Sequence, residues 1–323
     1  VALEAHHSKC YHLGMGKNVS KSSLARANQD RDYHIFEEYA YYLVSEARQK
    51  CANHIFKLGG NVYAFDSTTI DLCLSVFWWA KFRKKKGGTK VHTLYDVETQ
   101  IPAFFHITEA SVHDSKVMIE IPYEPSSYYI FDRGYSNFKM LYKIHQIEAY
   151  FVVRAKKNLG YKSIQWKRRL PKNVLSDASV LLTGFYPKQY YPEPLRLVKY
   201  WDEEQEREFI FITNAMHISA LQVAELYKNR WQVELFFKWL KQHLKIKRFW
   251  GTTENAVRIQ IYAAICAYCL VAIIQHDMQL DRSTYEVLQI LSISLTDKTY
   301  LRDLFNKTKF QNDKERFGPN GPS

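Results

Sequence analysis

Glycine and proline are scarce in this 323-residue chain, at 12 and 9 residues, so few segments are expected to be long linkers. Apolar residues make up 46% and charged residues 24%, which excludes wholesale disorder and fibrous structure. Cysteine is also rare, and the odd, scattered count of 5 argues against a disulfide scaffold and fits a reducing cytoplasm. The length allows about two domains, or one core with a large insertion.

Acidic residues are in deficit, with 33 Asp and Glu against 45 Lys and Arg, which gives a net charge of +12. Such an excess favours a polyanionic partner, first a nucleic acid and second an anionic membrane surface. The one candidate membrane segment, residues 259–274, is too short for a span of about 20 residues and contains Gln260. We expect a buried core helix there. Cys266 and Cys269 within it could form a zinc or redox pair, but core packing is favoured because no second ligand pair is near.

The pattern of apolar residues predicts a mixed α/β sheet with helices packed on it. Helices are expected within residues 1–58, at 136–146, from 219 to about 244 and at 256–278. Strands are expected at 61–66, 72–79, 91–96, 103–108, 128–132 and 149–154. An antiparallel pair is expected at 195–201 and 208–213, within a segment punctuated by prolines.

Five parts follow from this order. They are a helical part at 1–58, a first core part at 59–154, a β-rich insertion at 155–215, a second core part at 216–280 and a tail at 281–323. The chain begins with Val1 in sequence that already resembles the middle of a protein, so we expect further N-terminal sequence to be missing.

Two of the predicted strands end in an acid, Asp66 and Asp132. If the two strands are neighbours, both carboxylates project from one edge of the sheet and repel each other unless a cation lies between them. Hard oxygen ligands of this kind suit Mg²⁺ or Mn²⁺, and two such ions would clamp the attacking and leaving oxygens of a phosphodiester. Taken alone, an acid at the end of a strand is more often a helix cap or a turn residue.

The predicted helix from residue 219 presents Tyr227, Arg230, Glu234 and Lys241 within about 60° of one another, at 100° per residue. A second stripe is apolar, formed by Leu226, Val233, Phe237, Leu240 and Leu244. From residue 228 to 248 there are seven Lys or Arg and one carboxylate, Glu234. Glu234 is either part of a surface ion pair or a metal ligand flanked by cations that hold phosphates.

The spacing Tyr-x2-Arg-x3-Glu-x6-Lys resembles the signature of the insertion-sequence-4 family of bacterial DDE transposases. Asp66, in Phe-Asp-Ser-Thr, and Asp132, in Asp-Arg-Gly-Tyr, resemble the two earlier acids of that family. The spacing also agrees, because Asp132 follows Asp66 by 66 positions and Glu234 follows Asp132 by 102.

The resemblance covers residues 55 to 280 and implies an RNase H-like core. It implies that Asp66, Asp132 and Glu234 bind two Mg²⁺ ions, with Mn²⁺ as a possible substitute. The partners it implies are double-stranded DNA, as transposon inverted repeats and target DNA, and a second copy of the chain in a DNA-bound homodimer. DNA contacts are expected from a set of cations and one tyrosine, namely Tyr227, Arg230, Lys241, Lys84, Lys85, Lys86, Lys238 and Lys245.

Several residues keep two interpretations. The basic run at 81–90 could track phosphates or form a solvated turn. His113 and Asp114 could be a catalytic dyad, although a helix-start role for His113 is favoured, and core packing is favoured for Trp201. Rival functions are a repair or junction nuclease that hydrolyses without joining, and a DNA-binding protein without catalysis. The presence of all three acids argues against the last.

Overall fold

The computed structural model describes residues 11, 14, 19–52, 56–72, 77, 79–83, 86–243, 249, 251–294 and 299–305. The chain divides into two compact units. The first combines Val1–Lys50 with Arg248–Ser323, and the second is Cys51–Lys247.

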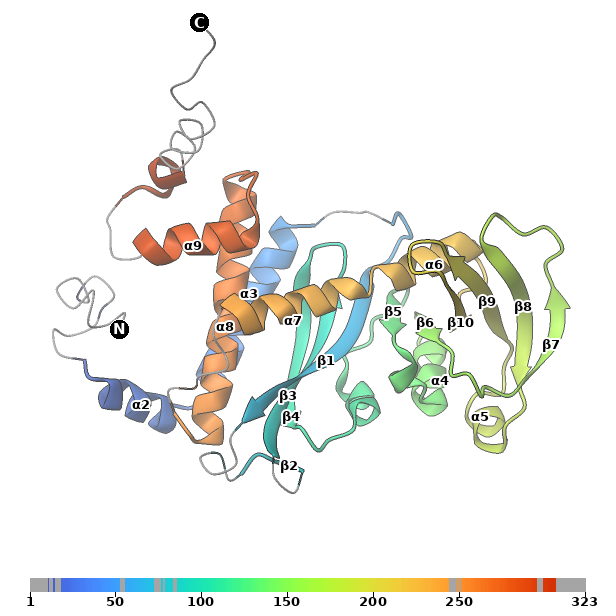
Figure 1. Ribbon diagram of the computed structural model, residues 1–323, viewed down its shortest axis with the longest axis horizontal. Coiled ribbons are helices and arrows are strands. Elements are labelled where there is room, and N and C mark those ends of the chain that lie inside the picture. The colour runs from blue at the N-terminus through green and yellow to red at the C-terminus, as the bar shows by residue number, and fades with distance from the viewer. Residues whose placement is uncertain are drawn as a thin grey trace, which may run out of the picture. The chain divides into compact units, whose positions relative to one another are not determined.

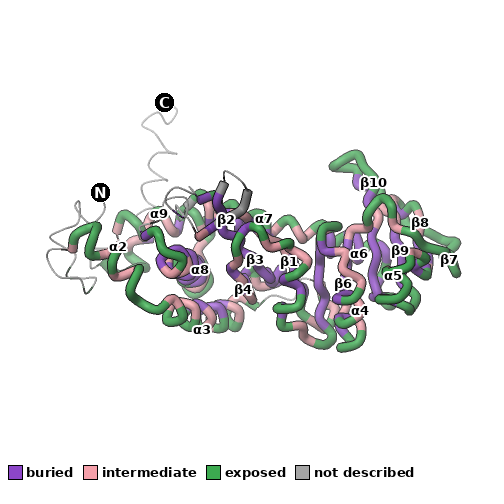
Figure 2. The backbone as a smooth tube through the Cα atoms, turned by 90° about the horizontal axis from the view of Figure 1, so that it is seen from below, coloured by how far each residue is buried: buried purple, intermediate pink, exposed green. Residues whose placement is uncertain are grey.

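The first unit contains helices α2 (Lys21–Asp30), α3 (His34–Lys50), α8 (Glu254–Asp277) and α9 (Thr284–Ser294) (Figure 1). Its core is α8, which packs along α3 and is buried along much of its length (Figure 2). By length and composition α8 could cross a membrane, and 56% of its most apolar window is buried within the structure. Cys266 and Cys269 are among its buried residues, as the core interpretation predicted.

The second unit is built on a single mixed sheet, which in the described residues has ten strands. Their order is β2-β3-β1-β5-β6-β10-β9-β8-β7, and β4 also pairs with β3. The neighbours β1, β5 and β6 are parallel, and the remaining pairs are antiparallel. The bounds are β1 Val62–Leu72, β2 Lys81–Arg83, β3 Lys86–Asp96, β4 Ile101–Glu109, β5 Tyr128–Phe131, β6 Tyr150–Arg154, β7 Tyr161–Trp166, β8 Val174–Leu182, β9 Leu195–Asp202 and β10 Arg207–Thr213.

The predicted mixed α/β fold is confirmed, and this sheet with its flanking helices is consistent with an RNase H-like core. The segment between β6 and α6 supplies β7 to β10, and β10 continues the sheet from the edge of β6 (Figure 1). The antiparallel pair predicted there corresponds to β9 and β10. The pattern did not reveal β7 and β8 individually.

Asp66 does not end its strand, which corrects the prediction for residues 61–66. β1 continues for six residues beyond Asp66 to Leu72, because β3 keeps pairing with it from Thr93 down to Gly87. Most of the separate strand predicted at 72–79 lies outside the described residues. Of those described there, Leu72 closes β1, and neither Phe77 nor Trp79 is in a strand.

The single helix predicted from residue 219 to about 244 is also wrong. It is two helices, α6 (Ala220–Lys228) and α7 (Trp231–His243). At the junction the hydrogen bonds tighten to three-residue steps, with the amide of Arg230 donating to Tyr227 O at 3.0 Å and that of Val233 to Arg230 O at 3.2 Å. The Asn229 side chain also donates to Glu225 O at 2.9 Å and closes α6.

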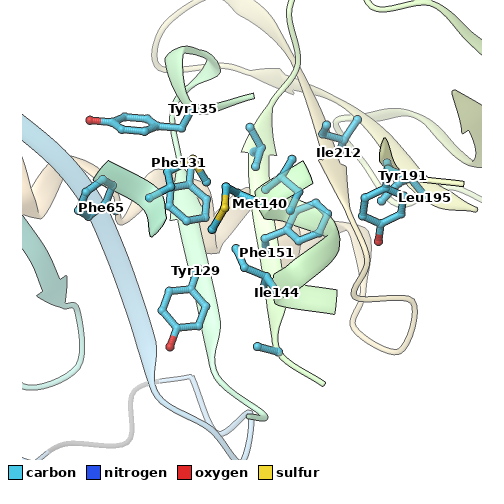
Figure 3. Close-up of a cluster of buried hydrophobic side chains, with 14 of the residues drawn as sticks. Phe65, Tyr129, Phe131, Tyr135, Met140, Ile144, Phe151, Tyr191, Leu195 and Ile212 are labelled. Atoms are coloured by element: carbon cyan, nitrogen blue, oxygen red, sulfur yellow. The ribbon is translucent and has the colours of Figure 1, made fainter. Parts of the chain in front are cut away.

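Helices lie on both faces of this sheet. On one face α4 (Phe138–Gln146) inserts Met140 and Ile144 against Phe65, Phe131 and Phe151 of the strands (Figure 3). The short helices η2 (Asp114–Glu120), η3 (Arg133–Tyr135) and α5 (Phe185–Tyr190) follow strands of the same unit. The other face of β1 and β3 carries α7 (Figure 1).

Contacts on the α7 side confirm the apolar stripe. Phe236 packs on Tyr95 of β3 with ring centroids 5.5 Å apart. The residues of the predicted stripe that the structure describes are buried, namely Leu226, Val233, Phe237 and Leu240, whereas Leu244 lies outside the described residues. Because strand side chains alternate between faces, Asp66 lies on the α7 side and Ser67 on the side of α4 and η2.

Gly60 provides a test of how β1 is aligned with β5. A Cβ atom on Gly60 would lie 2.0 Å from the carbonyl oxygen of Ser126, whose segment enters β5, and Tyr128 N donates to Asn61 O at 2.8 Å beside it. We expect Gly60→Ala to lower the free energy of unfolding by about 2 kcal/mol or more, because backbone must move. Gly134→Ala, where nothing lies within 4 Å, is the matched control and should change it by less than about 1 kcal/mol. Urea unfolding that gives equal values for both variants would contradict this alignment.

Candidate active site

Asp66 and Asp132 lie side by side on neighbouring parallel strands. The register between β1 and β5 ends at the pair Phe65 and Phe131, so the next residue of each strand is an aspartate at the same level. β5 stops there, since Asp132 is the N-cap of η3, while β1 continues along β3. The two aspartates therefore lie side by side where β5 ends and β1 loses its neighbour on that side.

Glu234 reaches the same place from the other layer. It lies in the first turn of α7, and α7 packs on β1 and β3. Its side chain is 55% exposed, compared with 21% for Asp66. The three acids predicted from the sequence are thus gathered from β1, the end of β5 and the start of α7.

Arg230 joins two of these acids. It donates through Nη1 to Asp66 Oδ2 at 2.7 Å and through Nη2 to Glu234 Oε1 at 2.6 Å. Its side chain is only 16% exposed, and its Nε is buried without a hydrogen-bond partner in the described part of the chain. Burial opposes its charge, but Tyr227, Asp66 and Glu234 together raise the pKa of the guanidinium above its usual range. Arg230 therefore stays charged between the two carboxylates.

Asp132 is held by a different pair of side chains. The hydroxyl of Tyr227, at the end of α6, donates to Asp132 Oδ1 at 2.8 Å, and Arg154 Nη1 lies 4.0 Å from the same oxygen. Burial, followed by the charge of Asp132, raises the pKa of Tyr227 to about 12, so the phenol stays protonated as a donor. Tyr227 also packs on Phe211 with ring centroids 4.8 Å apart, which fixes its direction.

The charge on Asp66 is disfavoured despite Arg230. Burial raises the pKa of the Asp66 carboxyl, and the nearby Glu234 and Asp132 raise it further, against the opposing effects of Arg230 and the Ser67 amide. The net pKa shift is upward, mainly because burial disfavours the charged carboxylate. A cation bound beside Asp66 would favour its ionised form.

A cleft of about 500 Å³ opens beside the acids. Asp66 and Glu234 line it together with Lys238 and Lys241, which follow Glu234 along α7. Acids and lysines on one wall can hold a metal ion and the phosphates of a nucleic acid side by side.

The donor set suits a hard divalent cation, since three carboxylates offer the oxygen ligands that Mg²⁺ and Mn²⁺ prefer. Among the described residues no group of three or more His, Cys, Asp or Glu has the geometry of a metal site. Arg230 takes the facing oxygens of Asp66 and Glu234, so metal binding there requires Arg230 to release at least one of them.

Comparison with known proteins agrees with this geometry. A family model described as the transposase DDE domain matches residues 57–270. A Sinorhizobium fredii protein named as a transposase is 36% identical over 288 residues, covering 87% of this chain and 78% of that protein. A Geobacillus stearothermophilus protein, named as the transposase of insertion sequence element IS5377, is 27% identical over 249 residues, covering 77% of this chain and 66% of that protein.

The chain belongs to the DDE transposase family. A further relative, from Synechocystis, is named as a transposase for the element IS4SA and is 25% identical over 306 residues, covering 90% of this chain and 83% of that protein. Family membership implies action on DNA. In this transposase the three acids of the candidate site all lie within the matched residues.

The other predicted residues fall into three groups. Lys238 and Lys241 line the cleft, and Tyr227 and Arg230 contact the acids. Lys84, Lys85 and Lys245 lie outside the described residues, and Lys86 begins β3. The prediction that Trp201 packs in the core is wrong, because its side chain on β9 is 39% exposed.

His113 and Asp114 do not form a dyad in the structure. The His113 side chain caps η2 by accepting from the Ser115 amide at 3.2 Å, as the favoured alternative predicted. Asp114 instead accepts from Ser67 at 2.8 Å. Sequence reasoning missed Arg154, Tyr135 and Ser67, and for these the only available signal was their position beside a predicted catalytic strand.

We expect Asp66→Asn to stabilise the metal-free transposase, because it removes a charge that its surroundings disfavour. The pKa of Asp66 is higher in the folded chain than the ordinary value near 3.8. The contribution of Asp66 to the free energy of unfolding therefore falls as the pH rises from that ordinary value through the pKa of the folded chain. The melting temperature of the variant should therefore exceed that of the parent by a margin that grows above about pH 4 and then levels off. Melting curves in a metal chelator at several pH values measure this. A parent that is more stable at neutral pH would contradict the raised pKa.

Proposed function

We propose that this chain is an insertion-sequence-4-type transposase that carries out cut-and-paste transposition. It nicks DNA at the ends of an element, frees a 3′-hydroxyl and joins that hydroxyl to target DNA. The signature spacing from Tyr227 to Lys241 supports this branch, and so does the likeness to the Synechocystis protein.

The convergence of three acids on one cationic junction carries the proposal. Asp66, Asp132 and Glu234 are far apart in the sequence, yet the α6–α7 junction contacts all three through Tyr227 and Arg230. A surface ion pair would explain the contact between Arg230 and Glu234 alone. It would not explain why two further carboxylates lie beside it, one of them with a raised pKa.

Asp66, Asp132 and Glu234 would hold two Mg²⁺ or Mn²⁺ ions as oxygen ligands. When bound, the ions activate the attacking water or 3′-hydroxyl and neutralise charge on the phosphate. Tyr227 and Arg154 keep Asp132 in place, and Lys238 and Lys241 bind phosphates along the cleft. Arg230, released from the acids, turns its two donors to a DNA phosphate, because a guanidinium matches phosphate as it matches carboxylate.

The remaining assignments rest on the family. The partners are the inverted repeats of the element and the target DNA, and two ends held together favour a DNA-bound homodimer. We place the protein in the cytoplasm at the nucleoid. Of the five-part division we keep the insertion at 155–215, because β7 to β10 extend the sheet outward from β6. The predicted second core part at 216–280 is divided, since α8 belongs to the unit that combines Val1–Lys50 with Arg248–Ser323.

Asp66→Asn tests the proposed site directly. We expect the parent to nick and join a donor that carries the cognate end when Mg²⁺ is present. Asp66→Asn should lower nicking by at least about 100-fold and leave DNA affinity within about threefold, because it removes a ligand charge but little volume. The control Asp71→Asn removes an exposed acid from the same strand and should behave as the parent. Nicking without joining would favour the nuclease alternative, and retained nicking by Asp66→Asn would exclude Asp66 from the site.

Lys241→Ala separates the phosphate contacts from the acids. We expect the slope of log affinity against log salt to fall by about one phosphate contact, and nicking to slow more than binding weakens, because Lys241 lines the cleft beside the reacting group. Lys172→Ala removes the same charge from a side chain that is 83% exposed and pairs with Glu203, so it serves as the control. Affinity at several salt concentrations and single-turnover nicking measure both effects. Identical behaviour of the two variants would make Lys241 a bystander.

A further inference from the structure

A second charged cluster lies directly behind Asp66, on the opposite face of β1. Asp114, the first residue of η2, accepts through Oδ1 from Ser67 Oγ at 2.8 Å and pairs through the same oxygen with Lys90 Nζ at 3.0 Å. Ser67 is the residue that follows Asp66. A carboxylate outside the three expected acids is thus one side chain away from the candidate site.

Lys90 makes this cluster rigid. It is only 9% exposed, and its ammonium also donates to the Val112 carbonyl at 2.8 Å. A buried ammonium requires a counter-charge, so Lys90 and Asp114 hold each other and pin the start of η2 against β3. Burial raises the pKa of Asp114, but hydrogen bonds from Lys90 and Ser67 outweigh it, and the net pKa is lowered.

His92 does not compete for this role. It is fully buried, and its Nδ1 lies 3.8 Å from Asp114 Oδ1. Burial lowers the pKa of His92 to about 4, so the ring is neutral at neutral pH and Lys90 supplies the positive charge. The other groups that face Asp114 are the hydroxyls of Ser67 and Tyr135.

The cluster reaches Asp66 through the backbone of Ser67. The Ser67 amide donates to Asp66 Oδ1 at 2.8 Å, and the Tyr135 hydroxyl lies 3.4 Å from the same oxygen. In the described residues β5 no longer pairs with β1 beyond Phe65. The part of β1 that begins at Asp66 therefore has a strand partner only on the β3 side. Asp114 holds Ser67 in place by a hydrogen bond, just beyond the point where β1 loses β5 as a neighbour.

We infer that Asp114 is a positioning residue for the catalytic site: it holds Ser67 in place, and the Ser67 amide in turn fixes the Asp66 carboxylate in the orientation that binds metal. This inference rests on the proposed function. Asp114 does not touch the metal or the DNA in this role. Partners that orient a metal ligand in this way commonly contribute 10- to 100-fold to metal affinity.

Two variants separate positioning from simple anchoring of η2. Asp114→Asn removes the charge but leaves Lys90 buried without a full counter-charge, so it could also unfold the protein. Ser67→Ala cuts the link to Asp66 while the pair of Asp114 and Lys90 stays intact. Ser67→Thr keeps a hydroxyl on a β-branched residue that suits a strand and should restore the link.

The experiment measures Mn²⁺ binding to the full chain without DNA, by the rise in melting temperature across a Mn²⁺ titration. We expect Ser67→Ala and Asp114→Asn to shift the half-maximal Mn²⁺ concentration upward by about 10-fold or more. Ser67→Thr and Asp71→Asn should stay within about threefold of the parent. The Mn²⁺ concentration for half-maximal nicking should shift in parallel.

The outcomes are distinct. If Ser67→Ala binds Mn²⁺ as the parent does, Asp114 only anchors η2 and the inference is overturned, while the proposed function stands. If Asp114→Asn unfolds, the half-maximal Mn²⁺ concentrations of Ser67→Ala and Ser67→Thr decide whether the inference holds. If the parent itself shows no Mn²⁺-dependent stabilisation that Asp66→Asn abolishes, the proposed metal site fails and the inference fails with it.

Discussion

The guanidinium of Arg230 is the group on which the arrangement of the site depends. Three carboxylates gathered at one point repel one another, and burial makes the repulsion stronger because less water screens it. Arg230 offsets this by donating to Asp66 and Glu234 at once, from a junction that also directs Tyr227 to Asp132. The planar guanidinium presents two terminal donors in a fixed geometry, whereas a lysine would present a single point charge.

Arg230, which makes this interaction, lies in the break between α6 and α7. A continuous helix would keep Tyr227, Arg230 and Glu234 on one stripe. Across the tightened turn at Asn229 the three side chains still face one site, because Tyr227 donates to Asp132 and Arg230 donates to both Asp66 and Glu234. The helices are set by ordinary signals, such as the Ser219 capping box and the buried apolar stripe. The junction is closed locally by the Asn229 side chain, and it places Arg230 between Asp66 and Glu234.

This difference explains how much the sequence could predict. Asp132 follows a short, fully buried strand, and Glu234 is a single acid in a basic segment, so local pattern marked both as candidates and the family resemblance favoured a shared site. The continuation of β1 past Asp66 was not predictable, because the polar residues that follow pair with β3 rather than with sequence neighbours. The contact of Arg230 with Asp66 and that of Asp114 with Ser67 join residues that are 164 and 47 positions apart. No periodicity encodes such distances.

Asp66 is therefore held from both faces of the sheet, on one face by a contact that a cation can replace and on the other by a buried hydrogen-bond network. On the α7 side it contacts Arg230, whose bond competes with any cation that takes the same oxygen. Its other oxygen, Oδ1, is held by the Ser67 amide, and Ser67 is tied to Asp114 and the buried Lys90 on the far face. In the proposed mechanism, release of Arg230 leaves this carboxylate already oriented. The metal ligand then needs no reorganisation when a cation replaces Arg230, which is the purpose of a preorganised site.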